Sequence, residues 1–179
     1  GDTGPDPLPE TLPDPERALG EWLGAQVSKR HLRLAGAAFD AGDFDRARAL
    51  VDSALAEDHA LVEAWMLLGS IEAEAGRLRD AEEALRAAIH AGPAHVPALH
   101  ALAALLELRG EHGDALDLWH RILELEPEYP EALAQIAEHR LEDDRPADAL
   151  PLLRRLARVQ PDNPKVQYNL GVAAGRAGL

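Results

Sequence analysis

The chain has 179 residues, a formal net charge of −14 at pH 7 and no cysteine. Nucleic-acid binding needs cationic side chains that displace counterions from phosphates, so this acidic balance argues against nucleic-acid partners and against adhesion to an anionic membrane. Without cysteine, disulfides, thiolate zinc sites and cysteine nucleophiles are excluded. Few aromatic residues and abundant alanine and leucine favour closely packed helices over β-structure.

Residues 1–13 are rich in proline and acidic residues and have no apolar periodicity, which predicts a linker or an extended arm. A helix is expected over 14–27, because Asp14 can act as its N-cap and Pro15 suits the first turn. Apolar side chains follow with helical spacing: Leu19, Trp22, Leu23 and Val27. We interpret this segment as an N-terminal capping helix with one face to bury.

From residue 28 onward, three sets of residues recur every 34 positions. They are the glycines Gly42, Gly76, Gly110 and Gly178, the alanines Ala47, Ala81, Ala115 and Ala149, and the prolines Pro93, Pro127 and Pro161, while Asp144 and His59 stand at two positions where the period is broken. Three residue types that share one period indicate a repeat array.

Each period is predicted to be a pair of helices. The recurring glycine ends the first helix, since glycine readily adopts positive φ, and the recurring proline follows the second helix. The predicted repeats are 28–61, 62–95, 96–129 and 130–163, followed by the first helix of a fifth repeat over 164–179. A terminal first helix leaves the groove for its second helix uncovered, so we expect the natural protein to continue.

The repeated unit resembles the tetratricopeptide repeat, whose 34-residue pattern is W-x2-L-G-x2-Y, then A-x3-F, then P. The segment 62–95 matches this pattern at Trp65, Leu68, Gly69, Ala81, Leu85 and Pro93. It departs from the pattern at Glu72, where an aromatic residue is usual. The resemblance covers about residues 28–179. It implies an all-α fold, a right-handed superhelical α-solenoid of antiparallel helix pairs with about four and a half repeats and an extra N-terminal helix.

Gly69 occupies a position that is small in every repeat. Its equivalents are Ala35, Ala103, Ala137 and Gly171. A small residue allows the second helix of the pair to approach closely, and this packing offsets the cost of glycine inside a helix, about 1 kcal/mol. We therefore assign the repeated positions to packing and not to function: Gly69, Ala81, Pro93, Ala115, Pro127, Ala149, Pro161 and Gly171.

No pattern of catalytic or metal-binding residues is recognised in the sequence. His90, His95 and His100 are five residues apart, a spacing that does not place side chains on one helix face as helical zinc pairs require. The histidines are interpreted as solvated surface residues. We therefore predict no enzyme within these residues, no cofactor and no metal.

In the family that the sequence resembles, the first helices line a concave groove that binds an extended or helical peptide. Projected onto this chain, the resemblance implies these groove residues: Lys29, Leu32, Phe39, Glu63, Met66, Ser70, His100, Glu107, Glu131, Glu138, Leu141, Glu142, Tyr168 and Asn169. Glutamates dominate its middle, which favours a basic or amphipathic partner segment. The alternative, ordinary solvated glutamates on an acidic protein, stays open.

The sequence therefore predicts a non-catalytic scaffold for protein–protein interaction. Two alternatives remain: the recognition arm of a larger enzyme, such as a transferase or an oxygenase, and a module that self-associates through its N-terminal helix or its open C-terminal end. No apolar run approaches the roughly 18 residues of a membrane span, so no membrane insertion is expected. The cytoplasm is the expected compartment and the periplasm the alternative.

Overall fold

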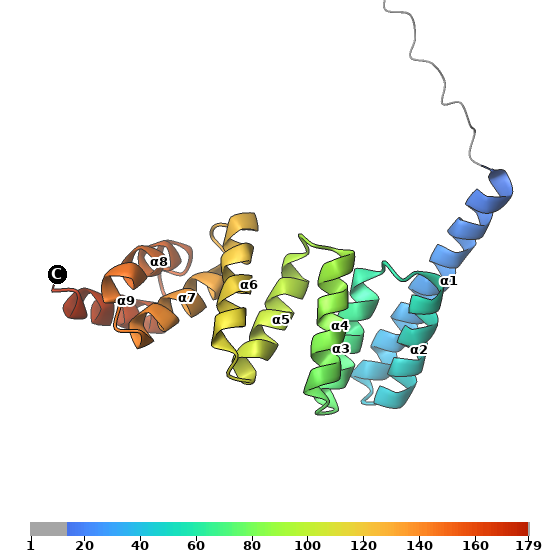
Figure 1. Cartoon of the computed structure of the whole chain (residues 1–179), viewed down its shortest axis with the longest axis horizontal. Coiled ribbons are helices and arrows are strands. Elements are labelled where there is room, and N and C mark those ends of the chain that lie inside the picture. Colours follow the sequence, from blue (N-terminus) through green and yellow to red (C-terminus); the bar gives the residue numbers. More distant parts are fainter. Residues whose placement is uncertain (1–13, 179) are drawn as a thin grey trace, which may run out of the picture.

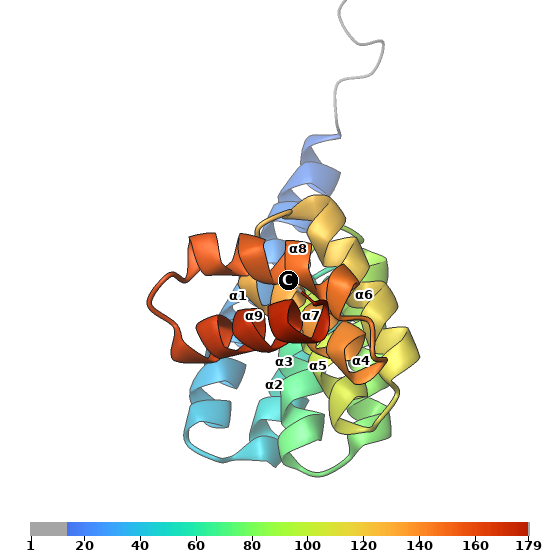
Figure 2. The ribbon, with the colours of Figure 1, turned by 90° about the vertical axis from the view of Figure 1, so that its left-hand side faces the viewer.

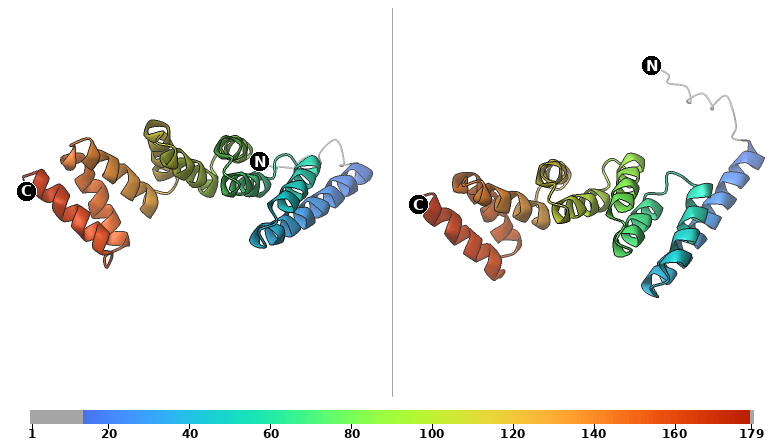
Figure 3. Two further views of the ribbon diagram at one scale, coloured as in Figure 1. Left: turned by 90° about the horizontal axis from the view of Figure 1, so that it is seen from below. Right: turned by 60° about the horizontal axis from the view of Figure 1, so that its bottom comes forward.

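The computed structural model describes residues 14–178, and the predicted arm over 1–13 lies outside this range. All regular structure within the described range is helical. The helices are α1 (Pro15–Asp40), α2 (Phe44–Glu57), α3 (Val62–Glu74), α4 (Leu78–Ala91), α5 (Val96–Leu108), α6 (His112–Leu125), α7 (Pro130–Glu142), α8 (Pro146–Val159) and α9 (Pro164–Arg176). Consecutive helices pack as pairs, and the pairs follow one another in an elongated row (Figures 1 and 3). The fold is an all-α solenoid, as the sequence predicted.

The direction of the helices changes along the row. Seen end-on, α8 and α9 run across the direction of α3 and α4 (Figure 2). The most extensive contacts lie within the pairs α1–α2, α3–α4, α5–α6 and α7–α8, and each pair touches the next through its second helix. Each repeat therefore buries its apolar surface against its neighbours, as expected for a repeat protein.

The N-terminal helix differs from the prediction. It is not a separate element over 14–27, because α1 is one continuous helix of 26 residues that also contains the first helix of repeat 1. No proline interrupts the chain between residues 16 and 40, so the helix has no reason to break. The Asp14 carboxylate caps it by accepting a hydrogen bond from the Glu16 backbone N–H at 3.0 Å.

The apolar face at the start of α1 is not buried. Leu19 is 57% exposed, Trp22 58% and Leu23 49%. The reason is the length of the partner helix: α2 ends at Glu57, whose side chain lies beside Gly24, and the first half of α1 projects beyond it (Figure 1).

The turns that follow the first helices have the backbone conformation that the recurring glycines predicted. Gly42, Gly76, Gly110 and Gly178 have φ between 75° and 77°, and Asp144, which replaces glycine in repeat 4, has φ of 58°. Asp144 is the single non-glycine residue with positive φ among the described residues. Aspartate tolerates this region better than most residues because its short side chain forms local hydrogen bonds.

Helices α3 and α4 cross closely at Gly69, the small position of this repeat. A Cβ atom on Gly69 would lie 2.8 Å from Cγ of Leu85 in the second helix of the same pair. The equivalent alanines of the other complete repeats, and the facing alanines Ala47, Ala81, Ala115 and Ala149, are fully buried. Gly69 and these alanines therefore lie in the packed contacts between helices. Gly171 differs, because nothing lies within 4 Å of a Cβ at that position.

The recurring prolines follow the ends of the second helices, as predicted, and their carbonyl groups tie neighbouring repeats together. Arg121 of α6 donates a hydrogen bond to the carbonyl of Pro93, and Arg155 of α8 donates the equivalent bond to the carbonyl of Pro127. Each arginine thus connects a second helix to the loop that precedes its own repeat.

Glu72 stands where the repeat pattern has an aromatic residue, and its side chain is only 1% exposed. It forms ion pairs with Arg48 of α2, at 3.3 Å, and with Arg77 of the turn after α3. A buried carboxylate needs such partners, because an isolated charge is costly to remove from water. The departure from the pattern is therefore compensated by two arginines from neighbouring segments.

Candidate functional site

The predicted groove residues all lie on the first helices of the pairs, α1, α3, α5, α7 and α9, and we call this surface the first-helix face. Successive first helices also touch one another, α1 with α3 and α3 with α5. The exposed members of the face are Lys29, Glu63, Ser70, Glu131, Glu142 and Tyr168. The partly buried members are Leu32, Phe39, Met66, His100, Glu107, Glu138, Leu141 and Asn169.

Three predicted groove residues contribute to packing. The ring centroids of Phe39 and Phe44 lie 5.7 Å apart, and both rings, together with Leu32, pack against the core formed by α1, α2 and α3. Leu141 packs in the same way against the core of the last pairs. These side chains lie at the border between the first-helix face and the core, which helical spacing alone does not distinguish.

A pocket of about 260 Å³ lies between α7 and α9, and we call it the α7–α9 pocket. Its floor is apolar and consists of the buried residues Leu153, Leu156 and Val166. Its polar rim includes three residues that the sequence placed in the groove: Glu131, Glu138 and Asn169. The carboxylate of Glu138 also forms an ion pair of 2.6 Å with Lys165.

His100 is held by residues from later in its own repeat. Its Nδ1 lies 2.6 Å from the hydroxyl of Tyr129, and its ring makes an edge contact with Trp119 at a centroid distance of 5.3 Å. Burial of Tyr129, together with the charges of Glu131 and Glu126, raises the pKa of its phenol. His100 therefore fixes the loop between α6 and α7 to α5.

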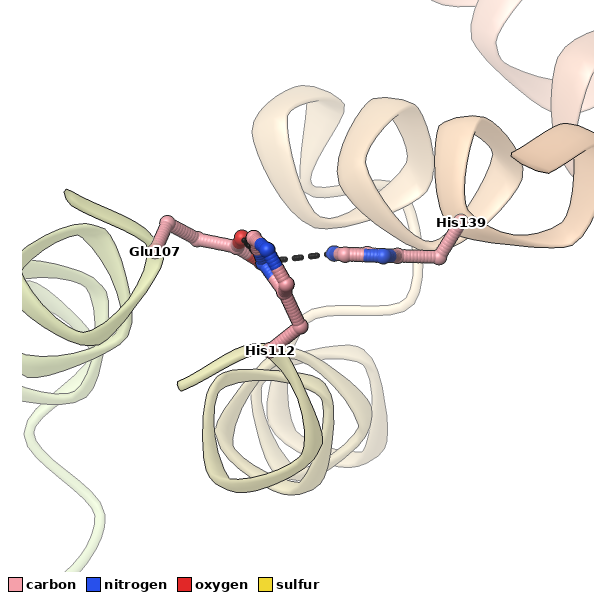
Figure 4. A group of neighbouring side chains, drawn as sticks. All are labelled: Glu107, His112 and His139. Carbon is pink, nitrogen blue, oxygen red and sulfur yellow. Dashed lines mark hydrogen bonds and ion pairs between the residues drawn. The ribbon is translucent and has the colours of Figure 1, made fainter. Parts of the chain in front are cut away.

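A second group of polar side chains, the Glu107 cluster, consists of Glu107 of α5, His112 of α6 and His139 of α7 (Figure 4). The Glu107 carboxylate lies between the two imidazoles. Its Oε2 is 2.6 Å from Nδ1 of His112, and its Oε1 is 2.8 Å from Nε2 of His139. The indole N–H of Trp119 also donates to Oε1, at 3.4 Å. The cluster thus joins three helices of two repeats.

Two effects set the pKa of Glu107. Burial alone would raise it, but hydrogen bonds from His139 and His112, the charge of His139 and the hydrogen bond from Trp119 outweigh burial, so the pKa is lowered. Glu107 is therefore a carboxylate at neutral pH.

The sequence placed Glu107 on the first-helix face but missed both histidines of the cluster. His139 is buried, not solvated, while His112 is exposed. His112 begins the second helix of repeat 3 and His139 lies in the first helix of repeat 4, so no i, i+4 spacing within one helix connects them. The packing of repeat 4 against repeat 3 brings them together, and no pattern within a single helix reveals that packing.

The first-helix face is less acidic than its glutamates suggest, because several of them are already paired. Glu107 is bound by two histidines, Glu138 by Lys165, and Glu142 lies 3.6 Å from Nδ1 of His139. Glu63 and Glu131 form no ion pair within residues 14–178. Among the glutamates of this face, the unpaired and exposed side chains in residues 14–178 are therefore Glu63 and Glu131.

These observations define an all-α repeat protein whose first helices present an exposed polar face. Models of the tetratricopeptide repeat match residues 32–96, 72–131 and 108–173. The matches cover most of the chain, which therefore belongs to the tetratricopeptide repeat family. No curated protein sequence matches it.

Several solved structures have a similar fold. The crystal structure of MamA has a TM-score of 0.73 and 20% sequence identity, over 86% of this chain and 84% of that one. YrrB, described as a TPR protein with an unusual peptide-binding site, has a TM-score of 0.70 and 21% identity, over 91% and 83%. A tetratricopeptide repeat protein from Parabacteroides merdae has a TM-score of 0.74 and 20% identity, over 86% and 61%. At these identities the likeness concerns the fold.

Tetratricopeptide repeats typically bind protein or peptide partners, and membership of this family suggests a scaffold for protein–protein interaction. Among the helices that the structure describes, none has the length and apolar character needed to cross a membrane.

Proposed function

We propose that the first-helix face binds an extended or helical segment of a partner protein, with the α7–α9 pocket as its anchoring point. The observation that carries this proposal is the chemistry of the pocket, an apolar floor inside a polar rim. Ligand sites commonly combine an apolar depression with a few placed polar groups. YrrB, a protein with a similar fold, has a peptide-binding site according to its description, which supports a peptide as the ligand class.

The rim favours a segment that is both apolar and basic. An apolar side chain can occupy the floor formed by Leu153 and Leu156, while the unpaired carboxylate of Glu131 attracts a cationic side chain beside it. The amide side chains of Gln160 and Asn169 offer hydrogen bonds to the backbone of an extended segment. Lys165 does not oppose a basic ligand strongly, because its charge is paired with Glu138.

The prediction is tested with a library of displayed peptides, followed by titration of the selected sequences. We expect basic amphipathic peptides to be selected, and the Glu131→Lys, Glu138→Lys double variant to weaken their binding at least tenfold. The matched control is Asp117→Lys, Glu124→Lys, which makes the same charge change at exposed positions of the second helix α6. Equal loss of binding in both variants would mean that net charge, and not the pocket, attracts the peptide.

A second candidate function is self-association through the exposed apolar stripe of α1, which consists of Leu19, Trp22, Leu23 and Val27. These residues lie at the i, i+3, i+4 and i+8 positions of one helix face, and Leu19, Trp22 and Leu23 precede Gly24, which lies beside the last residue of α2. A second copy of the chain presents the same stripe, so that two α1 helices can bury each other's apolar residues about a two-fold axis.

Sedimentation velocity at several concentrations tests this candidate. We expect a concentration-dependent dimer that the Trp22→Ser, Leu23→Ser variant converts to a monomer. The control is Leu108→Ser, which removes an apolar side chain that is 74% exposed on α5 and leaves the stripe intact. A wild-type protein that is monomeric at every concentration would exclude the candidate.

A further inference from the structure

We propose that Glu107, His112 and His139 form a binding site for a divalent transition-metal ion such as Zn²⁺, and that this ion links repeat 3 to repeat 4. The site is separate from the α7–α9 pocket and does not depend on the proposed peptide ligand. Its three residues come from α5, α6 and α7, so a bound ion would connect a first helix, the following second helix and the next first helix (Figure 4).

The ligand atoms are close enough to share one ion. One ligand atom from each residue lies within 4.8 Å of the other two. In a tetrahedral zinc site with metal–ligand distances of about 2.0 to 2.2 Å, neighbouring ligand atoms are about 3.4 Å apart. The 2.6 Å and 2.8 Å separations join the two oxygens of Glu107 to different imidazoles and are shorter than this value, whereas the group spans up to 4.8 Å, so the side chains must shift by about 1 to 1.5 Å to surround one ion.

The donor set selects the class of metal. Two imidazole nitrogens and one carboxylate oxygen suit zinc and other late first-row dications, whereas calcium and magnesium prefer sites made of oxygen alone. Three protein ligands leave the fourth tetrahedral position for water or for a group of a partner protein. To bind the metal, Nδ1 of His112 and Nε2 of His139 must each present a lone pair, so the proton that now bridges each nitrogen to the carboxylate moves to the other ring nitrogen or is released to water.

The surroundings orient the ligands as metal sites require. A histidine that binds zinc usually donates its other ring N–H to a carboxylate, and here Oε2 of Glu142 lies 3.6 Å from Nδ1 of His139. This arrangement leaves Nε2 of His139 for the metal. On the opposite side, the buried indole of Trp119 holds Oε1 of Glu107. One ligand, Glu107, is therefore held by a hydrogen bond from outside the cluster, and a second, His139, has a carboxylate nearby that is not yet within hydrogen-bond distance.

The arginine nearest to Glu107 in the sequence does not bind its carboxylate. Arg109 lies two residues after Glu107, but its guanidinium is bound to Glu82 of α4 and, at 2.6 Å, to Glu111. Arg109 therefore does not compete for Glu107, whose two oxygens face the two histidines.

Titration calorimetry with ZnCl₂, together with the visible absorption spectrum of the protein with CoCl₂, tests the site. We expect one Zn²⁺ per chain and, for Co²⁺, the intense absorption bands of a four- or five-coordinate ion. His112→Ala, His139→Ala and Glu107→Gln should each weaken Zn²⁺ binding at least tenfold. His112→Ala is the most informative variant, because the side chain is 55% exposed and its removal leaves the core unchanged.

The matched control is His90→Ala, His120→Ala, which removes two exposed histidines outside the cluster and should bind Zn²⁺ as the wild type does. As a second readout, Zn²⁺ should raise the unfolding temperature of the wild type and of this control, but not that of His112→Ala. The proposal is overturned if the wild type binds neither ion, or if the control loses as much affinity as His112→Ala.

Discussion

Replacing Gly69 by leucine is expected to lower the free energy of unfolding by about 3 kcal/mol, the upper part of the range for overpacked cores. Even the first added carbon would lie 2.8 Å from Cγ and 2.9 Å from Cδ2 of Leu85, which is itself buried. The longer side chain would therefore force α3 and α4 apart. The helix propensity of leucine, which exceeds that of glycine by nearly 1 kcal/mol, offsets only part of this cost.

The same substitution at Gly171 is the matched control, because this residue occupies the equivalent position of the last repeat. Nothing lies within 4 Å of an added Cβ there, so Gly171→Leu should gain stability from helix propensity alone, by about 0.5 to 1 kcal/mol. Urea denaturation followed by circular dichroism measures both variants. If the free energy of unfolding falls for Gly69→Leu and rises for Gly171→Leu, the close crossing at Gly69 is supported. Unchanged stability of Gly69→Leu would contradict it.

Replacing Trp119 by alanine is expected to cost about 3 to 5 kcal/mol, the usual range for the loss of a large buried aromatic side chain. Trp119 is 2% exposed and belongs to the largest core cluster, which contains residues from α4 to α7. It also contacts His100 and donates to Glu107, so its loss would loosen the joint between repeats 3 and 4.

Because repeats are stabilised by their nearest neighbours, this loss should reduce cooperativity as well as stability. We expect the denaturation curve of Trp119→Ala to broaden or to divide into two transitions. Trp22→Ala is the control, since that indole is 58% exposed and its removal should change the free energy of unfolding by no more than about 0.5 kcal/mol. It should be measured at low protein concentration, so that self-association does not contribute. Equal effects of the two substitutions would contradict this account of the core.

The sequence predicted the repeats well because each depends on local features that recur. The turn at Gly76 and the crossing at Gly69 are properties of one helix pair. The same residue types recur every 34 residues, so each repeat gives independent support to the same prediction. The boundary expected at residue 27 was wrong, because an apolar face does not show where a helix ends. Only a breaker such as proline would have indicated the end, and none is present before Asp40.

The candidate site was predicted less completely, because it depends on contacts between repeats. Helical projection placed Glu131, Glu138 and Asn169 on one face, and they do line one pocket. It gave no information on charge pairing, so it counted Glu107 and Glu138 as free acids although His139 and Lys165 bind them. Such pairs join residues about 30 positions apart, and no pattern within a single helix reveals them.

The uneven distribution of contacts has a mechanical consequence. Contacts within each helix pair are more extensive than contacts between pairs, and the latter are supplemented by the bonds of Arg121 and Arg155 to proline carbonyls. The pairs therefore act as stiff links and the junctions between them as compliant joints. Tension along the row would therefore extend the junctions between pairs before it distorts any helix. The stiffness of the whole molecule is then set by the contacts between neighbouring repeats.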